Sequence, residues 1–143
     1  MTGTRAPSQC IDVGRALDLL AEAVQARGEY FVYPPVWIRS ARSPYASDGE
    51  LRCLVGQALF LAGVADEDLA ALGDVGVRDL YTRGALPVGL TLGALAVFDA
   101  AQRTQDRGYA WGDALDYAQH VATRFLDLVP DAALQAAAVL ADT

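Results

Sequence analysis

The sequence contains no lysine, and all eleven of its basic residues are arginine. Without lysine the chain cannot form a Schiff base, and it has no phosphate-binding loop of the type that ends in Lys and Ser or Thr. Its two cysteines and single histidine cannot form a zinc site of the Cys/His type. We therefore expect no metal and no cofactor. Codon bias in a GC-rich genome explains the lack of lysine; selection against a lysine-directed modification is the alternative, which one sequence leaves open.

Positive charge and long apolar runs are also scarce. The formal net charge is −7, whereas a nucleic-acid-binding surface or an anionic membrane requires a basic face. The apolar stretches 53–65 and 85–101 are too short or too interrupted to span a bilayer. The N-terminal residues MTGTRAPSQC lack the apolar centre of a secretory signal. These absences predict a cytoplasmic protein with reduced cysteines, no direct nucleic-acid contact and no membrane contact.

Hydrophobic residues, by contrast, make up 53% of the chain, and many of them are alanine, the best helix former. A chain of 143 residues suggests one domain. We predict a flexible N-terminus over residues 1–9 and a single all-α domain over residues 10–143. The expected architecture is a compact bundle of five or six helices around a central apolar helix, together with an irregular arm rich in aromatic residues and proline.

Capping residues and apolar periodicity locate these helices. The segment 51–62 is apolar nearly all round, which is typical of a helix at the centre of a fold. Asp66 and Thr91 are expected caps. In the helix that follows Thr91, Leu92 is expected to face inward with Leu95, Ala96 and Phe98, and Arg103, Asp106 and Arg107 are expected to face water. The predicted helices cover residues 12–27, 51–62, 66–72, 91–107, 111–129 and 130–141, with one short turn at 77–81.

The arm is the most unusual segment. Residues 30–38 combine aromatic and β-branched side chains with Pro34 and Pro35, which indicates extended chain or one short edge strand, and a loop follows over 39–50. Aromatic residues and arginine are enriched in interface hot spots. The arm therefore either covers the core or binds a partner. In the second case the contact residues are Tyr30, Tyr33, Trp37, Arg39 and Arg42.

Cys53 and His120 are the one pair of residues that could form a nucleophile and its base. Cys53 lies near the start of its predicted helix, where a thiol pKa is lowered. However, its neighbours Leu54 and Val55 are typical of a core, and free cysteine is commonly buried as a small hydrophobe. A small cysteine-dependent enzyme or thiol sensor is thus an alternative, and a buried structural Cys53 is the simpler interpretation.

The helix over 111–129 has a clear apolar face and an opposite polar face. Trp111, Leu115, Ala118, Ala122, Phe125 and Val129 mark the apolar face. Asp113, Tyr117, His120 and Arg124 recur at helical spacing on the polar face. These four side chains are an ordinary solvated surface, part of a docking surface or half of an acid–base site.

One sequence resemblance adds an expectation about function. The stretch Cys53-Leu-Val-Gly-Gln-Ala-Leu59 and the later Phe98 to Leu115 segment resemble those of small uncharacterised helical proteins of GC-rich bacteria and their phages, which carry a Cys-Leu-x-Gly-x-x-Leu helix. The resemblance implies an accessory role. We therefore expect a non-enzymatic protein that acts through a protein partner or as a homodimer, with the arm and the polar face of 111–129 as the contact. An acidic inhibitor that covers a nucleic-acid-binding protein is a further alternative.

Overall fold

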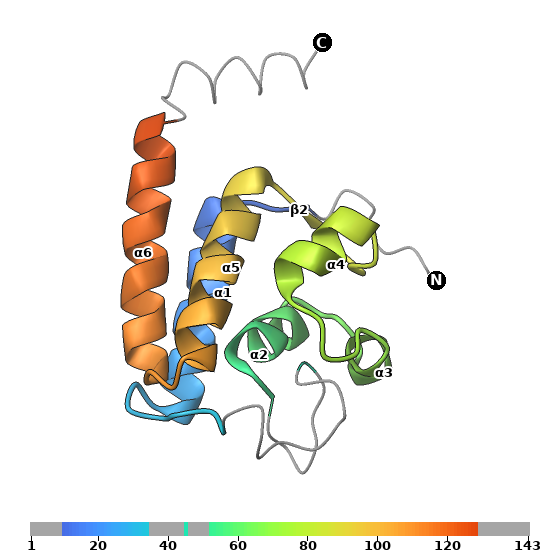
Figure 1. Ribbon diagram of the computed structural model, residues 1–143, viewed down its shortest axis with the longest axis horizontal. Helices are drawn as coiled ribbons and strands as arrows, with labels where there is room; N and C mark the ends of the chain where they lie inside the picture. Colours follow the sequence, from blue (N-terminus) through green and yellow to red (C-terminus); the bar gives the residue numbers. More distant parts are fainter. Residues whose placement is uncertain (1–9, 35–44, 46–51, 129–143) are drawn as a thin grey trace.

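The computed structural model describes residues 10–34, residue 45 and residues 52–128. Within these residues the fold is all-α, as predicted, with six helices and one very short parallel strand pair (Figure 1). The strands β1 (Cys10–Ile11) and β2 (Gly89–Leu90) pair Cys10 with Gly89 and Ile11 with Leu90. The helices are α1 (Val13–Arg27), α2 (Leu54–Leu61), α3 (Asp66–Ala70), α4 (Val77–Arg83), α5 (Leu92–Asp106) and α6 (Trp111–Leu128).

The three long helices pack against one another. Helices α1, α5 and α6 run alongside one another, and the shorter α2, α3 and α4 gather on the side of α5 that is away from α6 (Figure 1). The segment predicted as the central helix is α2, whose first turns are buried. Helix α5 shares the centre of the fold, because it contacts α1, α2, α4 and α6. Helix α5 therefore connects the long helices α1 and α6 to the shorter helices α2 and α4.

The first helix shows how closely local sequence signals determine an element. The Asp12 side chain accepts a hydrogen bond from the Arg15 amide at 2.8 Å, and Gly28, with φ 115°, ends the helix. The buried face consists of Ala16, Leu19, Leu20, Ala23 and Val24. Both predicted ends of this helix are confirmed.

Several predicted details are wrong. Leu92 is 63% exposed rather than buried, because it is the first residue of α5. Asp66 is not a cap, since it begins α3 and Ala65 holds the cap position without a side-chain hydrogen bond. The predicted turn at 77–81 is a full helix, α4. By contrast, the Thr91 cap is confirmed: its hydroxyl accepts from the Ala94 amide at 3.1 Å.

The described part of the arm, together with the preceding Glu29, accepts hydrogen bonds from the first amides of α6. The carbonyls of Glu29 and Phe31 accept hydrogen bonds from the amides of Gly112 (2.7 Å) and Trp111 (2.8 Å). The Phe31 ring also meets the Trp111 ring edge-to-face, with centroids 4.9 Å apart. No strand is found in residues 30–34, and residues 35–38 lie outside the described residues. The described residues of the arm, 30–34, therefore have a structural role, because they help to satisfy backbone donors at a helix end.

Other predictions fall on parts of the chain outside the described residues. These parts are the loop 39–50, apart from Tyr45, the last predicted helix, 130–141, and the side chains of Phe125 and Val129. Within the described residues, no helix is long and apolar enough to cross a membrane.

Candidate functional site

Cys53 is a core residue that caps a helix. Its side chain is fully buried, with 1% of the residue exposed, and it holds the N-cap position of α2. The sulfur accepts a hydrogen bond from the Gly56 amide at 3.3 Å. The predictions that Cys53 lies near a helix start and that it is buried are both confirmed.

Two glutamines of α5 extend this capping to neighbouring helices. Gln105 Oε1 accepts from the Leu54 amide of α2 at 2.7 Å and from the Trp111 indole at 3.2 Å. Gln102 Oε1 accepts from the Val77 amide, the first of α4, at 2.8 Å. Both side chains are buried. Because helix N-termini have unsatisfied amides, these contacts tie α2 and α4 to the central helix.

Tyr45 completes the buried network. Its hydroxyl accepts from Gln102 Nε2 at 2.7 Å and donates to the Val75 carbonyl. Burial, and secondarily the nearby Cys53, raise the pKa of the Tyr45 hydroxyl well above its ordinary value. A cavity of about 30 Å³ adjoins the network, room for one water molecule. It is lined by Cys53, Asp74, Val75, Gly76, Gln102, Gln105 and Asp106.

The two residues of the predicted nucleophile–base pair lie in different environments. His120 is exposed on α6, where its ring stacks with that of Tyr117 at a centroid distance of 6.4 Å. Cys53 is buried at the start of α2. Within the described residues there is also no group of three or more side chains of the kinds that could hold a metal ion.

The predicted partner-binding residues have different positions. Asp113, Tyr117, His120 and Arg124 are all exposed on α6, as expected for a polar face. In the arm, Tyr30 is 84% exposed, but Tyr33 is only 6% exposed and belongs to the core. The assignment of Tyr33 to a binding surface is therefore wrong, because the chain turns its ring inward. Trp37, Arg39 and Arg42 lie outside the described residues.

A groove between α4, α5 and α6 is larger than the cavity beside Tyr45. It has a volume of about 180 Å³. We call it the arginine groove; its lining residues are Arg78, Ala96, Asp99, Ala100, Arg103, Thr104, Arg107, Tyr117 and Val121. Of the predicted partner-binding residues that the structure describes, Tyr117 alone lines the groove.

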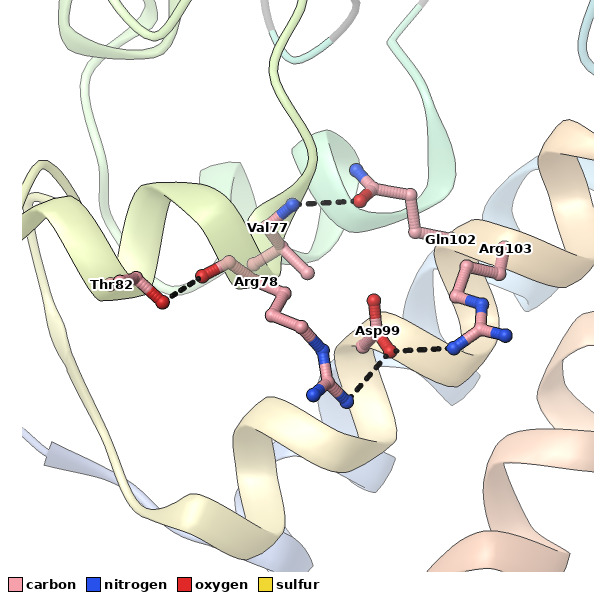
Figure 2. A network of polar contacts seen from close by, with 6 residues as sticks. All are labelled: Val77, Arg78, Thr82, Asp99, Gln102 and Arg103. Carbon is pink, nitrogen blue, oxygen red and sulfur yellow. Dashed lines mark hydrogen bonds and ion pairs between the residues drawn. The ribbon is translucent and has the colours of Figure 1, made fainter.

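A nearly buried carboxylate organises the arginine groove. The Asp99 side chain is 10% exposed, and its Oδ2 accepts from Arg78 at 3.2 Å and from Arg103 at 3.3 Å. Figure 2 shows the two guanidinium groups converging on Asp99 from α4 and α5. The Arg78 and Arg103 side chains are still 63% and 62% exposed. Asp99 thus orients two cations while leaving most of each accessible.

The charge of the groove differs from that of the whole chain. Three arginines and one aspartate give its lining a formal charge of +2, in a protein with a net charge of −7. Arg107 is exposed and has no ion-pair partner among the residues that the structure describes. Guanidinium groups in such a cluster bind carboxylates and phosphates through paired hydrogen bonds.

This groove was not predicted from the sequence. Arg103 and Arg107 were correctly expected to face water, but only a short turn was predicted at 77–81, the segment that contains Arg78. One signal was available: Asp99, Arg103 and Arg107 follow each other at helical spacing, so they share one face.

Comparisons with protein-family models, with curated proteins and with solved structures found no match to this chain.

Proposed function

We propose that this chain is a non-enzymatic interaction protein and that the arginine groove is its contact site for a protein partner. The observation that carries the proposal is the convergence of Arg78 and Arg103 on the nearly buried Asp99 beside an exposed Arg107. Arginine held in place by a buried partner loses little conformational entropy when it binds, which favours its use in an interface.

The size of the groove supports a protein partner. Sites for drug-sized ligands and cofactors usually enclose ~300–1,000 Å³. At about 180 Å³ the groove accommodates one or two side chains of a larger molecule. The buried position of Cys53, away from the exposed His120, supports the non-enzymatic part of the proposal.

In this proposal the protein works in the cytoplasm, and the presence of two free thiols, Cys10 and Cys53, supports that location. The resemblance of the Cys53 helix to proteins of GC-rich bacteria and their phages agrees with an accessory role.

The proposal is tested by blocking the groove. A library of displayed random peptides is selected on the immobilised protein, in parallel with the variants Ala96→Trp and Ala21→Trp. Ala96 lines the groove, whereas Ala21 is an exposed residue of α1. We expect peptides that bind the wild type and Ala21→Trp but not Ala96→Trp. Peptides that bind all three proteins equally would show that the contact site is elsewhere.

A further inference from the structure

We infer that the occupant of the arginine groove is an acidic segment of the partner, bound through its carboxylate side chains. This inference rests on the proposed function, because it names the chemistry of the partner at that same site. It is carried by charge complementarity, by the free donors of three arginines and by the apolar residues in the lining of the groove.

The arginines of the groove already bind one carboxylate, that of Asp99. Arg78 and Arg103 each direct one terminal nitrogen to Oδ2 of Asp99. A guanidinium group has five N–H donors, so both arginines keep donors for a second carboxylate. Arg107 has all of its donors available among the described residues. The charge of +2 that remains after Asp99 is counted matches two partner carboxylates.

The spacing of the arginines suits two acidic side chains. Arg103 and Arg107 lie four residues apart at the end of α5, and side chains at that spacing are neighbours on one face, ~6 Å apart at Cβ. Two glutamates at the same spacing on a partner helix, or on alternate positions of an extended segment at ~7 Å, would face them.

One feature favours carboxylate over phosphate. Phosphate sites commonly use free amides at a helix start. The amide of Val77, the first of α4, is instead bonded to Gln102 (Figure 2).

The apolar part of the groove lining suits the stem of a glutamate. Ala96, Ala100 and Val121 contribute apolar side chains to the lining, and Tyr117, which is 49% exposed, adds an aromatic ring. The methylene groups of a glutamate can lie on this surface while its carboxylate meets the guanidinium groups.

The test uses fluorescence anisotropy with a labelled peptide that alternates glutamate and alanine. Two further peptides carry glutamine or phosphoserine in place of glutamate. The protein variants are Arg103→Gln with Arg107→Gln, and a control with the same charge change, Arg15→Gln with Arg83→Gln. Arg15 and Arg83 are exposed and lie outside the groove. Arg107→Gln alone serves as a second variant, because Arg107 has no ion pair in the described structure to lose.

We expect the glutamate peptide to bind the wild type and the control alike and the groove double variant about tenfold more weakly, with Arg107→Gln in between. We also expect the glutamine peptide to bind weakly and added salt to weaken the glutamate complex. Absence of binding by the glutamate peptide, or tighter binding of the phosphoserine peptide, would overturn the inference. So would a wild-type dimer that the groove double variant converts to a monomer, since the occupant would then be a second copy of this chain.

The peptide selection separates this inference from the proposed function. If selected peptides depend on Ala96 but are not acidic, the groove is a contact site and the carboxylate assignment is wrong. If acidic peptides bind equally to the wild type, to Ala96→Trp and to the groove double variant, both proposals fail together.

Discussion

At the scale of single residues, the two cysteines differ most in their surroundings. Cys10 is exposed in β1, whereas Cys53 is enclosed in the core at the start of α2. A helix start lowers a thiol pKa, but reactivity also requires access of the reagent. We therefore expect burial to make the Cys53 thiol unreactive in the folded protein.

We predict that a thiol reagent labels Cys53 in the Cys10→Ser variant at least about a hundredfold more slowly than it labels Cys10 in the Cys53→Ser variant. The reason is that Cys53 becomes accessible only when the core opens, and core opening is rare in a stable domain. Denaturant should make the two rates equal. Rapid labelling of Cys53 in the folded protein would contradict its burial and would favour the thiol-sensor alternative.

Gly56 shows a second residue-level constraint. A Cβ atom at this position would lie 2.5 Å from both the Cα and the carbonyl oxygen of Tyr45. Such contacts require one backbone segment to move. The Gly-x-x-Leu part of the motif that includes Cys53 therefore has a packing role, because the glycine lets the Tyr45 backbone approach α2.

We predict that Gly56→Ala lowers the free energy of unfolding by about 1–3 kcal/mol, as overpacking in cores does. Gly14→Ala is the matched control in α1, where the new Cβ would make only an ordinary contact of 3.7 Å with Asp12. The control should be neutral or stabilising by up to about 1 kcal/mol, because alanine favours helix more than glycine does. Chemical denaturation measures both. Equal behaviour of the two variants would mean that Tyr45 does not pack on Gly56.

At the scale of elements, α5 organises its neighbours through polar side chains. Gln102 and Gln105 accept hydrogen bonds from the first amides of α4 and α2, and Asp99 holds Arg78 of α4. These residues lie on one helix between the arginine groove and the buried network around Tyr45. Helix α4 is thus attached to α5 through two consecutive residues of its first turn, Val77 and Arg78 (Figure 2).

Replacing Gln102 with alanine should lower the free energy of unfolding by about 1–3 kcal/mol, because the Val77 amide would lose its partner while remaining buried. Gln119→Ala is the control, since Gln119 is exposed on α6. Surface changes of this kind usually alter stability by less than about 0.5 kcal/mol. Thermal unfolding distinguishes the variants, and a Gln102→Ala protein as stable as Gln119→Ala would contradict the capping role.

Local signals explain which elements were predictable. The caps Asp12 and Thr91 and the glycines after α1 and α5 act within a few residues, so the ends of these helices follow from the sequence. The inward position of Tyr33 and the capping glutamines depend on contacts between distant segments, such as Gln105 with Leu54. Such contacts leave no local pattern in one sequence.

At the scale of the whole molecule, charge is distributed unevenly. A chain with a formal net charge of −7 contains a groove whose lining has the opposite sign. The groove combines residues of α4, α5 and α6, so it could not be derived without knowing how these helices pack. The polar face of α6 was recognised as a candidate surface, but its neighbours across the groove were not.

The most direct test of the arginine groove is a nuclear magnetic resonance titration of the ¹⁵N-labelled protein with the glutamate–alanine peptide, observing the arginine side-chain Nε–H signals. We predict that the signals of Arg103 and Arg107 shift progressively and saturate, while those of Arg15 and Arg83 remain unchanged. Equal small shifts of all four signals, or shifts confined to the arm around Tyr30, would contradict carboxylate binding in the groove.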